Sequence, residues 1–127
     1  MKRKDGTQFV GKMATSKGKQ VQGFLLTMFK EFRPAVPFEG PVSLTVAWCY
    51  PWRTSESKKN RAEGFKWCDT RPDCDNLTKM VKDVLTDLGF WHDDAQVARL
   101  LFEKGWSDKH GIGIAIESLE GTLSHNE

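Results

Sequence analysis

The pattern of hydrophobic and polar residues predicts a helix followed by a strand in the amino-terminal half of the chain. From about Ala14 to Phe32 apolar residues recur at steps of three and four, so they share one side of a helix. Arg33-Pro34 ends this helix, because the proline ring disfavours helical geometry at the residue before it. From Val42 to Tyr50 large apolar residues alternate with small or polar ones, which predicts a strand with one buried face.

The second half of the chain contains the clearest helix. A polar stretch from 51 to 71 shows no periodicity, and its length indicates a loop that is either functional or partly disordered. After Pro72 apolar residues follow the i, i+3, i+4, i+7 rule as far as Leu88. Asp75 is a good candidate for the N-cap of this helix, and Gly89 for the left-handed residue after its end.

Two further strands complete the predicted fold. Ala95 to Glu103 and Gly111 to Ser118 have strand patterns, and the intervening residues from Gly105 to His110 are rich in turn formers. The order of elements predicts an α+β fold with a small mixed or antiparallel sheet and two main helices packed on one face. A length of 127 residues with 39% hydrophobic residues fits one domain, 1–127.

Composition and charge narrow the class of protein. No apolar run is long enough to cross a bilayer and the first residues lack a signal-peptide core, so we expect a soluble, cytoplasmic protein. Three cysteines without a C-x-x-C pair favour reduced thiols over a disulfide framework. The net charge is only +2, but the segment up to Arg33 is strongly basic, which suggests a polyanionic partner.

The candidate chemistry lies in acidic residues on both sides of the second helix. If Asp73 to Asp75 is extended, both carboxylates point to the same side. Asp93 and Asp94 follow the helix, which is roughly 20 Å long, so the sheet must bring them back toward the first pair. Carboxylates gathered in this way would repel one another unless a hard divalent cation lay between them, and Mg²⁺, or Mn²⁺ in its place, fits such oxygen ligands. Phosphodiester hydrolysis is the matching reaction.

Each of these residues also has a purely structural interpretation. Lys79 follows Asp75 by four residues, so its ammonium could stabilise charge on a phosphate or simply form an ion pair with Asp75. Asp73 and Asp75 could cap the helix, and Asp93-Asp94 could form a solvated turn. Cys74 should face the opposite way and pack inside. A zinc site made from His92, Cys68 and Cys74 has no standard spacing to support it.

The polar stretch 51–71 carries the candidate residues for DNA binding. Its cations could neutralise phosphates while Trp52 or Trp67 stacks on an exposed base, or the segment could be a solvated connection. The residues assigned to DNA binding are Lys58, Lys59, Arg61, Lys66 and Arg71.

The block from Arg71 to Val97 resembles the signature of the RusA family of Holliday-junction resolvases, in which an aspartate pair and a lysine open a helix and a D-D-A-Q turn follows it. The resemblance is local and specific, and outside the block only the order of elements is similar. It runs with the same spacing through Asp73, Asp75, Asn76, Leu77, Lys79, Asp83, Leu85, Gly89, Phe90, Trp91, Asp93, Asp94, Ala95 and Gln96.

The resemblance implies a Mg²⁺-dependent endodeoxyribonuclease, bacterial or phage-encoded, that cuts four-way or other branched DNA in recombination and repair. It implies metal ligation by Asp73, Asp75 and Asp94 with Asp93 beside them, and Lys79 as the catalytic cation. It also implies a homodimer, whose twofold axis suits a twofold substrate. Family members usually open with an additional strand, and the pattern here suggests that the chain starts after it.

Two other functions remain open from the residues. The chain could be a module that binds branched or single-stranded DNA without cutting it, or a nuclease of the same chemistry directed at flaps or RNA.

Overall fold

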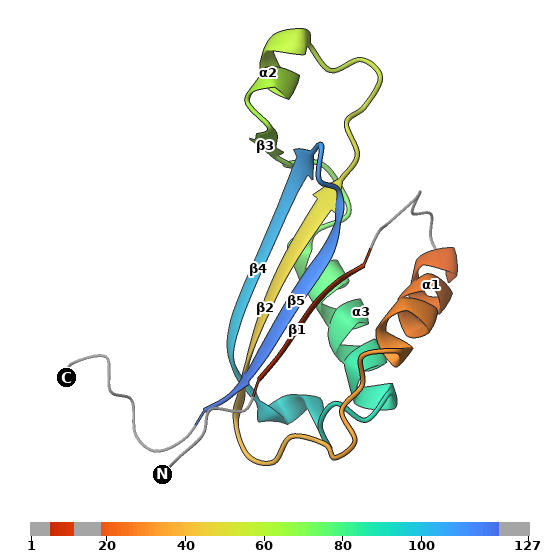
Figure 1. Ribbon diagram of the computed structural model, residues 1–127, viewed down its shortest axis with the longest axis vertical. Coiled ribbons are helices and arrows are strands. Elements are labelled where there is room, and N and C mark those ends of the chain that lie inside the picture. Colours follow the sequence, from red (N-terminus) through yellow and green to blue (C-terminus); the bar gives the residue numbers. More distant parts are fainter. Residues whose placement is uncertain (1–5, 12–18, 120–127) are drawn as a thin grey trace, which may run out of the picture.

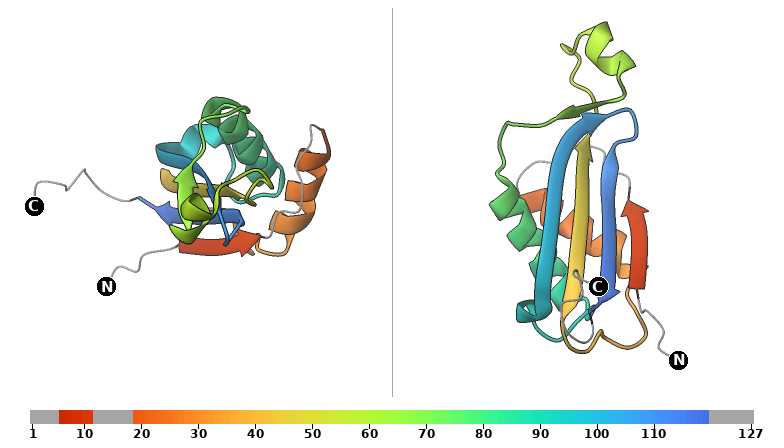
Figure 2. Two further views of the ribbon diagram at one scale, coloured as in Figure 1. Left: turned by 90° about the horizontal axis from the view of Figure 1, so that it is seen from above. Right: turned by 90° about the vertical axis from the view of Figure 1, so that its left-hand side faces the viewer.

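The fold is a mixed five-stranded sheet with helices on one face. The computed structural model describes residues 6–11 and 19–119. The strands are β1 (Gly6–Gly11), β2 (Val42–Tyr50), β3 (Phe65–Trp67), β4 (Val97–Ser107) and β5 (Gly111–Ser118), in the order β1-β5-β2-β4-β3. The helices α1 (Lys19–Lys30) and α3 (Cys74–Asp87) cover the same face, which confirms the predicted α+β class (Figures 1 and 2).

The central strands β2 and β4 run parallel to each other, and the other pairs are antiparallel. Parallel neighbours need a long crossover, and the segment containing α3 provides it. Leu88 ends α3 as its C-cap, and the amides of Gly89 and Phe90 then bond back to the carbonyls of Thr86 and Leu85, each at 3.0 Å. Gly89 has φ 84°, which confirms the predicted left-handed residue.

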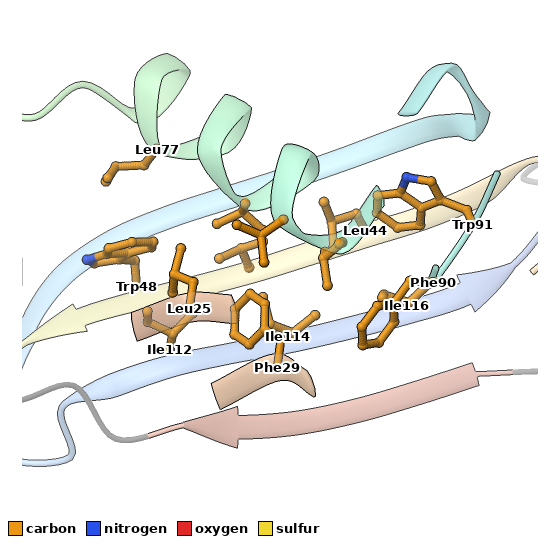
Figure 3. Close-up of a cluster of buried hydrophobic side chains, with 14 of the residues drawn as sticks. Leu25, Phe29, Leu44, Trp48, Leu77, Phe90, Trp91, Ile112, Ile114 and Ile116 are labelled. Atoms are coloured by element: carbon orange, nitrogen blue, oxygen red, sulfur yellow. The ribbon is translucent and has the colours of Figure 1, made fainter. Parts of the chain in front are cut away.

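The core lies between the sheet and the two helices. Alternate residues of β2 and β5 point toward α1 and α3, where Leu44, Trp48 and Ile112 are fully buried. Figure 3 shows that the core extends along α3, with Leu77 and Trp48 toward one end and Phe90 and Trp91 toward the other. The two ends of α3 are therefore separated by the whole length of the core.

Several boundaries differ from the predictions. The expected first helix begins with residues outside the described ranges, but its end at Lys30 lies close to the expected one. The strand at Val42–Tyr50 is confirmed with its bounds. The predicted strand at Ala95 starts later, because a short 3₁₀ helix, η1 (Asp94–Gln96), precedes β4. That strand also extends through Gly105 to Ser107, so the turn before β5 is shorter than predicted.

The amino-terminal strand that seemed to be missing is present. β1 pairs with β5 from Gly6↔Glu117 to Gly11↔Ile112 and forms one edge of the sheet. It escaped detection because a six-residue strand containing glycine and polar residues gives little alternation.

The segment 51–71, which was predicted to be a loop, contains regular secondary structure. The segment contains α2 (Lys58–Ala62) and β3, and β3 pairs with the end of β4. Residues 52–67 form a small lobe at this end of the sheet, and α2 lies beyond the ends of the strands (Figure 1). The helix α2 has no buried residue, so the lobe lacks the apolar periodicity by which helices are recognised.

Candidate metal centre at the ends of helix α3

The first acidic pair lies at the amino-terminal end of α3. Asp73 is the N-cap residue with extended backbone (φ −69°, ψ 151°), and Asp75 lies in the first helical turn. The N-cap is therefore Asp73 and not Asp75, and the segment between them is not an extended strand. Both residues are exposed, and Cys74 between them is half-buried.

Asp73 occupies a capping position without using its side chain as a cap. Its carboxylate makes no hydrogen bond to the helix amides. Among the residues that the structure describes, no ion pair joins Asp75 to Lys79, although both belong to α3 and lie four residues apart. The carboxylates of Asp73 and Asp75 and the exposed ammonium of Lys79 are therefore available to a ligand.

A buried lysine fixes the chain just before Asp73. Lys104 on β4 is only 9% exposed, and its Nζ donates to the carbonyl oxygens of Thr70 and Pro72 at 2.5 and 2.7 Å. The sequence analysis missed this residue. Its signal was a cation between Phe102 and Trp106, at an inward position of an alternating strand.

A hollow of about 400 Å³ adjoins Asp73 and is lined by α3, β2 and the segment before α3. Arg71 and Asn76 contribute polar groups, while Trp48 and Leu77 contribute apolar surface. Within the described residues, neither Trp48 Nε1 nor the Tyr50 hydroxyl, both of them buried, meets the geometry of a hydrogen bond with a partner. Burial raises the pKa of Tyr50 to about 12, so this hydroxyl keeps its proton and remains a donor.

The second acidic group lies at the opposite end of α3. Asp93 is the N-cap of η1, and its carboxylate accepts from the amide of Ala95 at 2.8 Å. The half-buried Asp94 follows it in η1. The sequence analysis left open that Asp93 and Asp94 both form a turn. Of the two, Asp93 has this role.

Gln96 holds this turn in place through both ends of its side-chain amide. Its Oε1 accepts from the amides of His92 and Asp93 at 2.7 and 3.0 Å. Its Nε2 donates to the carbonyls of Phe38 and Gly40 at 3.0 and 2.8 Å, in the segment that leads into β2. Asp94 is therefore fixed beside the beginning of β2, whereas the hollow next to Asp73 includes Tyr50 at the end of that strand.

One chain does not bring the predicted ligands together. The 14 residues of α3 span roughly 21 Å at 1.5 Å per residue, and Asp73 and Asp94 lie beyond its two ends. Within residues 6–11 and 19–119, no group of three or more acidic, histidine or cysteine side chains is close enough to hold a metal ion. The expectation that the sheet returns Asp94 to Asp73 and Asp75 within one chain therefore does not hold.

The predicted DNA-binding cations differ in their availability. Arg61 donates to the carbonyl of Arg53 at 2.7 Å, and Lys66 forms an ion pair with Glu56 at 3.1 Å, so both are used within the lobe. The side chains of Lys58 and Lys59 on α2 are exposed, and so is that of Arg71.

The two predicted stacking tryptophans also differ. Trp52 is half-buried and donates to Asp108 at 2.6 Å, whereas Trp67 is 64% exposed. Of the two, only Trp67 presents a largely open ring to an unstacked base.

Exposed carboxylates supply the oxygen ligands that Mg²⁺ prefers. The chain belongs to the family described as "Endodeoxyribonuclease RusA", whose profile matches residues 2–117. It is 32% identical over 109 residues to the uncharacterized protein YqaN of Bacillus subtilis, covering 82% of this chain and 76% of YqaN. It is 33% identical over 76 residues to the crossover junction endodeoxyribonuclease rusA of Lactococcus phage r1t, covering 60% of this chain and 53% of the phage protein. In the described part of the chain no helix could span a membrane.

Proposed function

We propose that this protein is a Mg²⁺-dependent endonuclease that resolves Holliday junctions and related branched DNA as a homodimer. The observation that carries the proposal is the family match over residues 2–117, combined with carboxylates at the start of α3 that serve neither as caps nor as ion-pair partners of Lys79. Exposed acids of this kind would be costly near DNA phosphates unless a cation neutralised them.

Asp73, Asp75 and Asp94 are the proposed metal ligands, with Asp93 orienting the turn that carries Asp94. Bound Mg²⁺ would supply charge neutralisation at the phosphate and acidify a water molecule. Lys79 would place a fixed positive charge beside the reacting phosphate, where negative charge develops. Lys104 would hold the Thr70–Pro72 backbone, and thereby the start of α3, in position.

The separation of the acids supports a site that is built from two copies. Magnesium binds oxygen ligands at about 2.0–2.1 Å, so a single ion cannot contact carboxylates separated by the length of α3. In a dimer with antiparallel α3 helices, Asp73 and Asp75 of one copy would meet Asp94 of the other. A twofold axis would then generate two equivalent sites, one for each strand to be cut.

The DNA surface in this proposal includes Lys58 and Lys59 on the lobe and Arg71 next to the acids. These cations would contact phosphates, which positions the substrate without reading its sequence. The hollow beside Asp73 would receive part of a nucleotide next to the cut, and Trp67 would stack on a base unpaired at the branch.

A labelled four-way junction incubated with Mg²⁺ tests the function directly. We expect nicks in opposing strands, and a loss of more than about a hundredfold in rate for Asp75→Asn, because metal ligation contributes several kcal/mol. Asp69→Asn is the matched control, since this exposed acid lies in the segment before α3. Binding of the junction without nicks in Mg²⁺ or Mn²⁺ would favour the non-catalytic DNA-binding alternative. Cleavage by Asp75→Asn at the parent rate would refute the assigned chemistry.

Mixing two inactive variants tests whether the sites are shared between copies. Asp75→Asn and Asp94→Asn should each be inactive as homodimers. A mixed dimer keeps one intact site, composed of the acid pair from the Asp94→Asn copy and Asp94 from the Asp75→Asn copy. Nicking should therefore reappear after subunit exchange. If the mixture stays as inactive as its components, the shared site is wrong.

A further inference from the structure

Two neighbouring aromatic side chains of the lobe are exposed although they belong to a strand. Phe65 and Trp67 occupy alternate positions of β3 and expose 39% and 64% of their surface. A large aromatic side chain contributes to folding through burial, so Trp67 contributes little in this position. Adjacent exposed aromatic side chains are typical of a binding surface. We call these two residues the aromatic pair.

The aromatic pair is held in a fixed arrangement. The ring centroids are 4.9 Å apart and the ring planes are at 90°, the edge-to-face contact that aromatic side chains prefer. In the pairing of β3 with β4, Phe65 lies opposite Ser107 and Trp67 lies opposite Gly105. Ser107 Oγ also donates to the carbonyl oxygen of Gly64 at 3.0 Å, just before Phe65. The main chain of β3 and the ring of Phe65 therefore support the exposed ring of Trp67.

Gly105 provides the room for this arrangement. A Cβ at this position would overlap Cε1 and Cζ of Phe65 and would lie 3.1 Å from the carbonyl oxygen of Lys66. The ring of Phe65 thus lies directly against the main chain of β4, and only glycine permits such a close approach. Because glycine weakens the interior of a strand, the contact with Phe65 gives this glycine a specific role.

The aromatic pair lies on the face of the sheet that carries no helix. Phe102 stacks on the buried Trp48 with a centroid distance of 6.0 Å, so the even-numbered side chains of β4 face the helices. Odd-numbered positions face the other way, and residues paired across two strands share a face. Trp67 is paired with Gly105, so its ring projects on the side opposite α1 and α3.

The chain between the aromatic pair and the first acids is attached to β4. The amide of Cys68 donates to the main-chain oxygen of Lys104 at 3.1 Å. The buried Nζ of Lys104 then donates to the carbonyl oxygens of Thr70 and Pro72 at 2.5 and 2.7 Å. Residues 68–73 span at most roughly 20 Å even when fully extended. The aromatic pair therefore keeps a fixed and short distance from the start of α3.

The charge of the lobe indicates which kind of ligand would meet the aromatic pair. Residues 52–67 contain five basic and two acidic side chains, a net charge of +3. Lys58 and Lys59 are exposed on α2 of the same lobe. Cations beside an exposed aromatic ring suit a nucleic acid, because phosphates contact the cations while a base stacks on the ring.

We propose that the aromatic pair recognises the branch point of DNA: Trp67 stacks on a base there, and Phe65 holds the ring of Trp67 in position. This inference rests on the proposed function, which makes branched DNA the substrate. An unpaired base costs less to unstack than a base within a duplex, so the stacking favours branched over linear DNA. Trp67 is thus a residue for substrate selectivity, and Phe65 and Gly105 are positioning residues.

Affinity for two kinds of DNA tests the role of Trp67. The probes are a four-way junction and a linear duplex of the same arm sequence, measured by fluorescence anisotropy in EDTA so that no Mg²⁺-dependent cutting occurs. Trp67→Ala should weaken junction binding by roughly tenfold and leave duplex binding unchanged, because the stacking of one base is lost. Trp67→Phe should retain most of the affinity. Val36→Ala is the matched control, since Val36 is a 70% exposed apolar residue outside the lobe.

A double-mutant cycle tests whether Phe65 acts through Trp67. Phe65→Ala alone should weaken junction binding, whereas Phe65→Ala added to Trp67→Ala should change it no further. Gly105→Ala should resemble Phe65→Ala, because the new Cβ displaces the same ring. Additive losses from Phe65→Ala and Trp67→Ala would contradict the positioning role of Phe65. Equal losses of junction and duplex affinity in Trp67→Ala would overturn the selectivity.

Branch recognition and nuclease activity can fail independently. A parent protein that cuts junctions although Trp67→Ala keeps the parent's selectivity would refute the role of the aromatic pair and leave the proposed function standing. A parent that prefers junctions through Trp67 but never cuts them in Mg²⁺ or Mn²⁺ would support the recognition and refute the nuclease. If Trp67→Ala alters the sedimentation of the free protein and leaves junction affinity unchanged, the pair serves a protein contact and the inference is wrong.

Discussion

Glu56 is the centre of the polar contacts that shape the lobe. Its carboxylate accepts from Asn60 Nδ2 at 2.6 Å and from Lys66 Nζ at 3.1 Å. Arg53 reaches the same carboxylate at 3.4 Å and also lies over the ring of Trp106, 4.5 Å from its centroid. These polar contacts attach the lobe to the end of the sheet. The lobe itself has no apolar core.

The same contacts make the lobe sensitive to acid. Hydrogen bonds from Asn60 and then Lys66 lower the pKa of Glu56 from 4.5 to about 2. Because the folded pKa is depressed, the stabilisation is complete above pH 4.5 and is lost as the pH falls toward 2. The protection of the amides of residues 57–66, measured relative to the intrinsic exchange rate at each pH, should therefore fall over this pH window.

Two glutamate variants separate this effect from general acid unfolding. Glu56→Gln should show fast exchange in the lobe already at neutral pH, because it loses the ion pair with Lys66. Glu63→Gln, an exposed residue just after α2, should behave like the parent. Equal acid sensitivity of the lobe in the parent and in Glu56→Gln would contradict the role of this carboxylate.

Residue types and spacing predicted which residues lie together at the start of α3, but not where Asp94 lies. Asp73, Asp75 and Lys79 lie within two helical turns, so recognising the helix was sufficient to place them together. The position of Asp94 depends on the parallel pairing of β2 with β4, a contact between distant segments that no local pattern encodes. Lys104 was missed because its partners are carbonyl oxygens, which every residue has.

At the scale of elements, the turn between α3 and β4 is the most tightly bonded connection in the site. The C-terminal motif of α3 leads into Trp91, and Phe38 forms a parallel bridge with it. Trp91 Nε1 donates to the hydroxyl of Thr86 at 2.7 Å. Together with the bonds of Gln96, these contacts fix the direction in which Asp94 leaves the helix.

Gln96→Ala should therefore damage both stability and the candidate site. Gln96 makes four hydrogen bonds to main-chain groups, and each such bond contributes about 0.5–1.5 kcal/mol. We expect a loss of about 2 kcal/mol or more in urea denaturation. His92→Ala is the control: the ion pair of His92 with Glu39 joins side chains that are 56% and 75% exposed, so its loss should change stability by less than about 1 kcal/mol. Similar losses for both variants would contradict this assignment.

The elements with an apolar face could be predicted from sequence, and those held by polar contacts could not. β2 and α3 each bury a regular apolar stripe, and both were found. The lobe lacked such a stripe, so α2 and β3 were taken for loop. The strand predicted from Ala95 begins two residues later, at Val97, because a 3₁₀ turn at Asp94–Gln96 precedes it. This turn was not predicted, because its formation depends on a side-chain capping box.

At the scale of the whole molecule, the sheet has two unlike edges. β1 closes one edge as a short strand, whereas β4 leaves most of the other edge open in the described part of the chain (Figure 2). The acid-bearing ends of α3 lie toward the two ends of this open edge. In the proposed homodimer, the acids of one site would come from two copies of the chain.

Cleavage should accordingly depend on protein concentration. If the proposed site is shared between two copies, the rate per subunit should fall when the protein is diluted below the dissociation constant of its dimer, because dissociation would remove Asp94 from the partner's acid pair. The comparison is between initial rates on a four-way junction and the dimer fraction measured by mass photometry. A constant rate per subunit in a fully monomeric sample would contradict a shared site.

The length of α3 has a further consequence for how DNA would be cut. In the proposed dimer the two metal centres are as far apart as Asp73 and Asp94 are within one chain, at least roughly 20 Å. This distance corresponds to about six nucleotides along a B-form strand at 3.4 Å each. The length of α3 would thus set the spacing between the two cuts. Inserting or deleting one turn of α3 should move the two nicks relative to each other.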